Sequence, residues 1–155
     1  VNHSLIFHHF GNKQQLWRAV KQSFMTQFDA LLIDPQPDQS FKDYLAHYVK
    51  SRLAFYQANP GLLRMINWQH LEPNQERLIG IPGSHFWQHM LSVVALFQEK
   101  NEIERSLPAD FVIKFILTTT VNFSQGMLFC EDGQLNDEEQ KLAAVIGVIA
   151  KALQP

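Results

Sequence analysis

Cysteine is nearly absent from the chain, with Cys130 the only one among 155 residues. An internal disulfide is therefore excluded, and this usage is typical of a protein in the reducing cytoplasm. Long apolar runs are also missing. Residues 78–98 lack Asp, Glu, Lys and Arg, but proline, glycine and histidine interrupt them, so they do not predict a membrane span. No signal peptide is visible, and we expect a cytoplasmic protein that does not engage a membrane.

Signatures of catalysis are missing as well. No Ser-His-acid arrangement and no phosphate-binding glycine loop occurs in the chain. His85 and His89 have the spacing of a two-ligand metal face that His70 could join, but no carboxylate or thiolate is in register with them. Cys130 stands beside two acids, which disfavour a thiolate, so we expect a buried structural cysteine. The sequence predicts no enzyme, no cofactor and no metal.

Acidic residues are absent from the first part of the chain, where none precedes Asp29. The ionised side chains there are Lys13, Arg18 and Lys21, accompanied by three histidines, on a chain whose formal net charge is -2. A local basic face on an otherwise acidic protein attracts phosphate without making the whole surface adhesive. A solvated helix end has the same charges, so charge alone leaves both interpretations open.

Sustained alternation of polar and apolar residues is also missing. Apolar residues recur at helical spacing instead, so we predict an all-α fold. Capping residues and prolines mark the helix starts. The expected helices are 13–33, 40–58, 60–72, 84–100, 106–130 and 136–153, the last opened by a capping box of Asn136 and Glu139. Residues 34–38, with two prolines, form the expected hinge between domains 1–33 and 34–155.

Residues 1–16 read Val-Asn-His-Ser-Leu-Ile-Phe-His-His-Phe-Gly-Asn-Lys-Gln-Gln-Leu. This stretch resembles the end of the DNA-binding domain in the tetracycline-repressor (TetR) family, where a short recognition helix is followed by a small-residue turn, Ser/Asn-Lys and a Leu. The Phe-x-Asn-Lys-x-x-Leu part is the most specific, and the rest of the chain resembles the family only in architecture. The resemblance implies a TetR-like fold: the C-terminal part of a helix-turn-helix domain with its connecting helix in 1–33, and a ligand-binding and dimerisation domain in 34–155.

The resemblance also implies roles in DNA binding. The residues that fall where the family's recognition helix meets base edges in the major groove are Asn2, His3, Ser4 and Leu5. Those that fall where the family contacts the sugar–phosphate backbone are Phe7, His8, His9 and Lys13. Phe7 replaces the usual Tyr, whose hydroxyl reaches a phosphate, so we expect Phe7 mainly to pack. Because the family places two further helices before this point, we expect residues 1–155 to belong to a longer chain and to bind DNA poorly alone.

The last two expected helices are apolar on more than one face, and the chain has few other helices left to cover both faces. Between Phe111 and Cys130 the only ionised side chain is Lys114, and the final helix has both an apolar stripe and a small-residue stripe around Gly147. Burying apolar area contributes about 25 cal/mol per Å², so pairing with a second copy would be favourable. A monomer with a thick core is the alternative. The resemblance implies a homodimer formed through the last two helices.

The middle helices combine bulky aromatics and methionines with a few polar groups, as a small-molecule pocket requires. The candidate ligand-binding residues are Tyr48, Arg52, Phe55, Met65, Trp68, Phe86, Met90, Thr119, Asn122 and Phe123. A plain aromatic core has the same pattern, so the residues alone leave both interpretations open. The resemblance favours an effector cavity whose occupation changes the spacing of the recognition helices.

With the resemblance, the sequence predicts a DNA-binding transcriptional regulator, a repressor that leaves its operator when a small ligand binds. The alternative from another class is a helical enzyme or carrier that uses the aromatic interior for an apolar small molecule. The residues upstream of Val1 discriminate between the two, because only the regulator requires the first half of a helix-turn-helix there.

Overall fold

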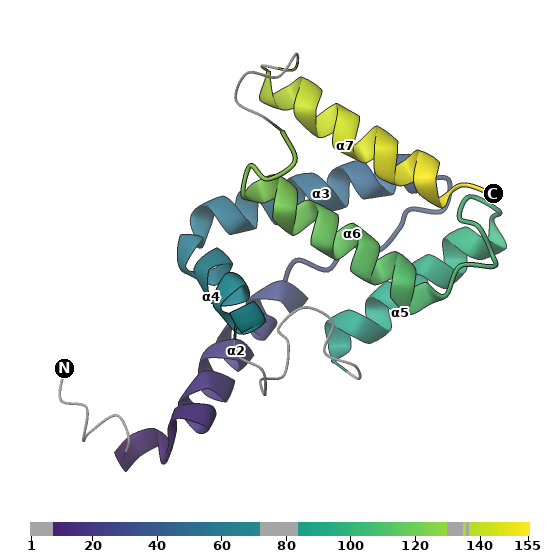
Figure 1. Cartoon of the computed structure of the whole chain (residues 1–155). Helices are drawn as coiled ribbons and strands as arrows, with labels where there is room; N and C mark the ends of the chain where they lie inside the picture. The colour runs from purple at the N-terminus through teal and green to yellow at the C-terminus, as the bar shows by residue number, and fades with distance from the viewer. Residues whose placement is uncertain (1–7, 72–83, 130–134, 136) are drawn as a thin grey trace. The chain divides into compact units, whose positions relative to one another are not determined.

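The computed structural model describes residues 8–71, 84–129, 135 and 137–155, and the regular structure in these residues is entirely helical. The helices are α2 (Lys13–Asp29), α3 (Phe41–Ala58), α4 (Pro60–Leu71), α5 (His85–Glu99), α6 (Ala109–Ser124) and α7 (Glu138–Leu153) (Figure 1). The predicted all-α fold is confirmed. The chain divides into two compact units, Val1–Leu32 and Ile33–Pro155.

Three helix starts are as predicted, because each is fixed by a local capping residue. The side chains of Asn12, Ser40 and Ser84 each accept a hydrogen bond from the backbone N–H three residues later, at 2.9, 3.1 and 3.2 Å. A side-chain oxygen in this position satisfies an N–H group that has no partner within the helix. Local capping hydrogen bonds therefore determine where α2, α3 and α5 begin.

The helix predicted to reach residue 130 is shorter, because α6 ends at Ser124. Gly126 follows with φ of +72°, and the N–H groups of Gly126 and Met127 bond to the carbonyls of Phe123 and Asn122. This pair of bonds around a left-handed glycine is a Schellman motif, which satisfies the last carbonyls of a helix.

Two other helix boundaries in the structure also differ from the predicted ones. The helix expected to reach residue 33 ends at Asp29, since the N–H groups of Leu31 and Leu32 bond to carbonyls three residues back instead of four. At α7 the capping residue is Asp137, whose carboxylate accepts from the N–H of Gln140 at 3.2 Å. The expected capping residue Asn136 lies outside the described residues.

The first unit contains a short helical segment, a turn and a long helix. Residues 8–10 are helical, and Gly11 turns the chain with φ of +77° before α2 begins. The positive φ requires glycine at this position, whereas the side chain of Gln15, which a Cβ on Gly11 would meet, is flexible and could move aside. This arrangement is the one expected from the sequence.

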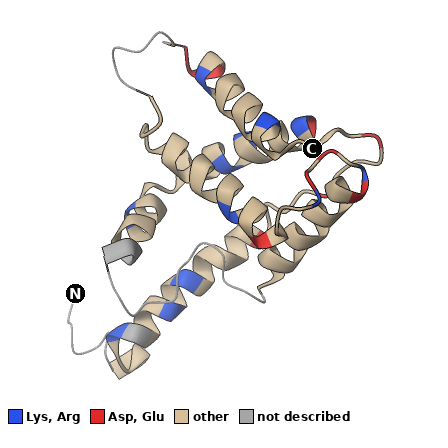
Figure 2. Ribbon diagram, turned by 45° about the vertical axis from the view of Figure 1, so that its right-hand side comes forward, with Lys and Arg blue, Asp and Glu red and all other residues tan. Residues whose placement is uncertain are grey.

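The basic charge of this unit is smaller at the surface than predicted. Figure 2 shows Lys and Arg along α2, but Lys21 is only 4% exposed and its ammonium lies 6.0 Å from the centroid of the Trp17 ring. The predicted basic face therefore consists of Lys13 and Arg18 among the described residues, because Lys21 faces inward.

In the second unit α3 is the helix against which α4, α6 and α7 pack, while α5 packs on α6 (Figure 1). The core between these helices contains apolar side chains with no exposed area, among them Leu45, Val49, Phe97, Ile113 and Ile149. The connection from α5 to α6 contributes the buried Ile103 to this core. It also contacts the C-terminal end of α7, because the N–H of Glu104 donates to the carbonyl of Leu153 at 2.7 Å.

Candidate functional site

One face of α3 carries polar side chains into the interior of the second unit. Arg52 is 1% exposed, and its guanidinium carbon lies 5.1 Å from the ring centroid of Tyr48 and 5.0 Å from that of Phe86. Aromatic faces attract a cation, and the attraction is stronger where water is excluded. Three of the predicted ligand-binding residues are thereby brought together.

Tyr44 extends this face toward the start of α3 and is absent from the sequence-based candidates. Its ring stacks on that of Tyr48, with centroids 6.2 Å apart, and lies 5.5 Å from that of Phe97 on α5. The Tyr44 hydroxyl is buried and has no hydrogen-bond partner among the described residues. The signal was available in the sequence, because Tyr44 precedes Tyr48 by four residues and Arg52 by eight, which places all three on one helix face.

The interior keeps these hydroxyl groups protonated. Burial is the main cause that raises the pKa of Tyr44, Tyr48 and Tyr56 above the usual value of 10.0, because a phenolate is poorly solvated there. Arg52 acts in the opposite direction on all three pKa values by favouring negative charge. At neutral pH the three tyrosine hydroxyl groups are therefore neutral.

The remaining candidates on the middle helices differ in burial. Met65, Met90 and Phe123 are buried, Phe55, Thr119 and Asn122 are half-buried, and Trp68 is 53% exposed. Met90 lies one helical turn after Phe86 and extends the apolar wall on α5. The structure thus gathers Tyr48, Arg52 and Phe86 most closely, and the role of the full set in ligand binding stays a prediction.

His89 on α5 contacts the first two residues of the second unit, Ile33 and Asp34. Its Nε2 lies 3.1 Å from the carbonyl oxygen of Ile33, its Nδ1 lies 3.6 Å from a carboxylate oxygen of Asp34, and the side chain is 15% exposed. A proton on Nε2 donates to the Ile33 carbonyl, and protonation of both nitrogens adds the ion pair with Asp34. His89, which the sequence singled out only for its metal-ligand spacing, therefore holds the segment by which the first unit is covalently joined.

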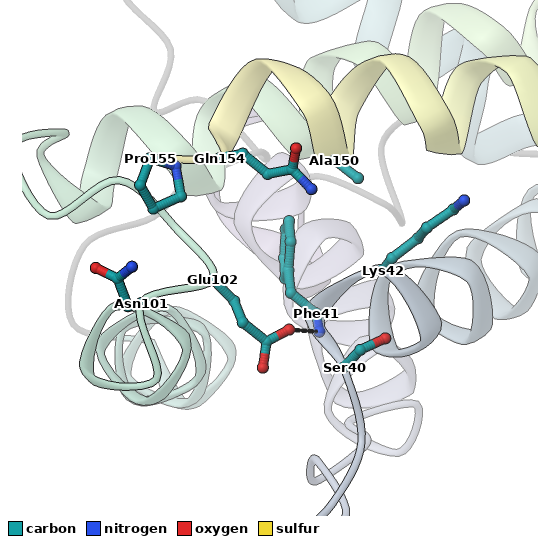
Figure 3. A pocket seen from close by; sticks show the side chains of 8 residues that line it. All are labelled: Ser40, Phe41, Lys42, Asn101, Glu102, Ala150, Gln154 and Pro155. Atoms are coloured by element: carbon teal, nitrogen blue, oxygen red, sulfur yellow. Dashed lines mark hydrogen bonds between the residues drawn. The ribbon is translucent and has the colours of Figure 1, made fainter.

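A separate hollow of about 420 Å³ lies at the start of α3 (Figure 3). It is lined by Ser40, Phe41, Lys42, Asn101, Glu102, Ala150, Gln154 and Pro155. Glu102 occupies the helix end, because its Oε2 accepts a 2.6 Å hydrogen bond from the backbone N–H of Phe41. A carboxylate is already present where an anion would bind, so this hollow does not suit an anionic ligand. Its residues come from three distant segments, so no local pattern in the sequence indicates it.

The structure describes three of the predicted DNA-binding residues. His8 and His9 lie in the helical segment before Gly11, and Lys13 is the first residue of α2, where backbone N–H groups favour an anion. All three side chains are exposed. Asn2, His3, Ser4, Leu5 and Phe7 lie outside the described residues, so the structure does not test them.

Apolar side chains are exposed on and beside the last two helices. The largest are Phe111 (50%), Met127 (69%), Leu128 (42%) and Val148 (66%). Phe111 stacks on Phe115 along α6, with ring centroids 6.1 Å apart. On α7, Gly147 has nothing in this chain within 4 Å of the position that a Cβ would take. These apolar side chains are exposed in the single chain, although their chemistry favours burial.

Within the described ranges, no three His, Cys, Asp or Glu side chains come together in a way that could hold a metal ion. None of the helices in those ranges combines the length and the apolar character that crossing a bilayer requires. Cys130 lies outside the described residues, so the buried structural cysteine stays a prediction.

Comparison with known proteins supplies one match. Residues 44–151, which are most of the chain, match the family model described as tetracyclin repressor-like, C-terminal domain. No curated protein and no solved structure matches the chain. The matched range begins at Tyr44 and includes the polar face of α3, all of α5 and α6, and nearly all of α7.

Proposed function

The chain belongs to the tetracycline-repressor (TetR) family of transcriptional regulators, and from this membership we propose that it is a homodimeric repressor that leaves its operator when a small ligand binds. The observation that carries the proposal is the family match over residues 44–151. The arrangement of the first unit, the exposed apolar residues of α6 and α7, and the polar interior of α3 support its three parts.

DNA binding is assigned to the first unit. The helical residues 8–10, the turn at Gly11 and α2 follow one another as in the end of a helix-turn-helix domain. We propose that Asn2 to Leu5 read base edges and that His8, His9 and Lys13 hold the phosphate backbone. Phosphate contacts position a protein on DNA without reading its sequence, so loss of Lys13 should weaken all sites equally.

Dimerisation is assigned to α6 and α7. Phe111 and Val148 are half-exposed or more, although their chemistry favours burial, and Gly147 leaves room for close approach of another helix. A second copy would bury these side chains through the same surface on both subunits. Two first units held at a fixed distance would then meet two operator half-sites.

Ligand relief is assigned to the interior between α3 and α5. Phe86 and Met90 line this interior from α5, and His89 on the same helix holds Ile33 and Asp34. A ligand that displaces α5 would therefore also displace the segment through which the first unit is attached. Operator affinity falls if the ligand binds more tightly to the form with the wrong spacing of the DNA-binding ends.

The test is selection of operator DNA from a random double-stranded pool by the full-length gene product. We expect a selected site with two half-sites, which the protein binds far more tightly than random DNA. Lys13→Gln should weaken binding to every sequence and lower the slope of log affinity against log salt by about 1. Lys42→Gln, the same change at an exposed lysine of α3, is the control and should leave both unchanged.

A reporter gene placed behind the selected operator tests the direction of regulation. Expression should fall when the protein is produced and recover with Lys13→Gln. Absence of any sequence-selective binding by the full-length protein would contradict the proposed function.

A further inference from the structure

Residues 33–41 lead from the boundary of the first unit into α3, and we call them the connecting segment. The beginning of this segment is held by α5. One ring nitrogen of His89 lies 3.1 Å from the carbonyl oxygen of Ile33, and the other lies 3.6 Å from the carboxylate of Asp34. The His89 side chain is only 15% exposed, and a hydrogen bond is electrostatically stronger where water is largely excluded. This contact therefore fixes the start of the connecting segment.

The middle of the connecting segment is held from the other end of the same helix. The ammonium of Lys100, directly after α5, donates to the carbonyl of Pro37 at 2.7 Å and lies 3.5 Å from the carbonyl oxygen of Gln39. It also lies 5.5 Å from the centroid of the Phe97 ring, so one cation joins a core residue of α5 to the segment. A single rigid helix thus contacts the connecting segment at two separate points.

The end of the connecting segment is fixed by the turn that follows α5. Oε2 of Glu102 accepts the 2.6 Å hydrogen bond from the N–H of Phe41, as Figure 3 shows. The N–H of Glu102 in turn donates to the carbonyl of Phe97 at 2.9 Å. Between these contacts the segment closes a turn, in which the N–H of Gln39 donates to the carbonyl of Gln36 at 3.1 Å. The beginning, middle and end of the segment are each joined to α5 or its C-terminal turn.

The contacts of the backbone change partner at the boundary between the two units. The N–H groups of Leu31 and Leu32 bond back to carbonyls of α2, at 3.0 and 3.2 Å. From Ile33 onward the contacts are those with α5. The division between the two compact units falls at the same place. A chain that is held on both sides of one peptide bond turns most easily about the dihedral angles next to that bond.

We propose that the pivot between the two units is the backbone at Leu32 and Ile33. His89 and Lys100 are then positioning residues, which make the connecting segment move with α5. Residues 34–38, where the two prolines predict a hinge, belong to the moving body instead. The inference rests on the proposed function, in which displacement of α5 reaches the DNA-binding end. Because the segment is held along its length, that displacement is passed to the pivot and is not absorbed within the loop.

Insertion of two glycines into the full-length protein tests where the pivot lies. Between Leu32 and Ile33 the insertion should lower affinity for the selected operator roughly 10-fold or more, because the spacing of the two DNA-binding ends is no longer fixed. Between Asp38 and Gln39 the same insertion only enlarges an exposed turn, so operator affinity should stay within about 2-fold of the wild type. Equal effects of the two insertions would overturn the inference, because a hinge at 34–38 makes them equivalent.

The hold of Lys100 is tested without DNA by electron paramagnetic resonance. The probe is a nitroxide attached at the exposed position Gln36→Cys, with Cys130→Ser so that each chain carries one label. Lys100→Met keeps an apolar side chain over the Phe97 ring but removes the donor, so the line shape should become more mobile. Lys100→Arg keeps donors and should retain the ordered line shape. An unchanged line shape in Lys100→Met would overturn the inference, and Lys50→Met, at an exposed lysine of α3, is the matched control.

The hold of His89 is tested by combining a substitution with the insertion after Asp38. In His89→Leu the start of the segment is released, so this insertion should lower operator affinity roughly 10-fold, a loss that is absent in the wild type. His89→Gln keeps an N–H donor for the Ile33 carbonyl and serves as the control. An insertion without effect in His89→Leu would overturn the role of His89.

The outcomes also separate this inference from the proposed function. A full-length protein that selects no operator contradicts the proposed function, whereas the line shape of the Gln36 label still decides whether Lys100 holds the segment. Unequal insertions in a protein whose operator affinity no ligand changes support the pivot and contradict ligand relief.

Discussion

Two regions differ from the usual rule that polar side chains face water and apolar ones are buried. The inner face of α3 buries polar side chains, whereas the outer faces of α6 and α7 expose apolar ones. Inside, Tyr44, Tyr48 and Arg52 are buried although they carry hydroxyl and guanidinium groups. Outside, Phe111 and Val148 leave apolar surface in water. Each departure costs free energy in the isolated chain. The first lies in the region to which we assign ligand binding, and the second in the region to which we assign dimerisation.

Replacing one phenylalanine by alanine in each region should lower the free energy of unfolding by different amounts. Phe97 has no exposed area and packs on Phe41 and Tyr44, so Phe97→Ala should lower the free energy of unfolding by about 3–5 kcal/mol. Phe111 is half-exposed, so Phe111→Ala should cost about 1 kcal/mol or less within one chain. Urea denaturation at several protein concentrations measures both. Equal losses would remove the distinction between the two regions.

Alkaline pH should destabilise only the inner region, since all three tyrosines of the chain lie on α3. Burial raises the folded-state pKa of each above its unfolded value. Their contribution to stability is therefore complete below about pH 10 and is lost as the pH rises, by about 1.4 kcal/mol per pH unit for each tyrosine. Tyr44→Phe should reduce this slope by one tyrosine's share in urea denaturation between pH 9 and 11. A slope equal to that of the wild type would show that Tyr44 titrates normally in the folded state.

Charge on the outer faces of α6 and α7 should dissociate the proposed dimer. The double variant Phe111→Lys with Val148→Lys should weaken self-association by about 100-fold, because two lysines would be buried at the interface without partners. Light scattering against protein concentration measures this. Ala95→Lys, at an exposed position of α5, is the control and should associate like the wild type. A monomeric mass for the wild type at micromolar concentration would contradict the dimer.

The smallest expected effect is that of Gly147→Ala, which should stabilise the monomer in denaturation experiments but weaken self-association in light scattering. Gly147 lies inside α7 with open space at its Cβ position, so Gly147→Ala should raise the stability of the monomer by about 0.5–1 kcal/mol through helix propensity. In the proposed dimer the added methyl group would meet the partner and weaken association. Denaturation of the monomeric double variant with and without Gly147→Ala gives the first value, and light scattering of Gly147→Ala alone gives the second. Stabilisation accompanied by unchanged association would place Gly147 outside the interface.

Part of the candidate site was legible in the sequence. The order Tyr48, Arg52, Phe55 at helical spacing predicted one face of α3, and the structure brings the first two together with Phe86 from α5. Tyr44 was missed although its spacing is the same. Trp68 was included because it is aromatic, yet it is 53% exposed, since composition does not say which way a helix turns its side chains.

The fold was predicted best where short-range chemistry decides it. Capping by Asn12, Ser40 and Ser84 and the turn at Gly11 involve partners within four residues, so the sequence by itself determined the starts of α2, α3 and α5 and the all-α class. The end of α6 was also local, in the left-handed Gly126, but its motif was not recognised.

Only the tertiary structure decided which side chains meet across long separations. It buries Lys21, joins His89 to Ile33 and Asp34, and sets Glu102 on the first N–H of α3. It also leaves Phe111 outside while enclosing Arg52. Periodicity marks the faces of a helix, but which face is covered depends on what the other helices bring against it, and that is a property of packing alone.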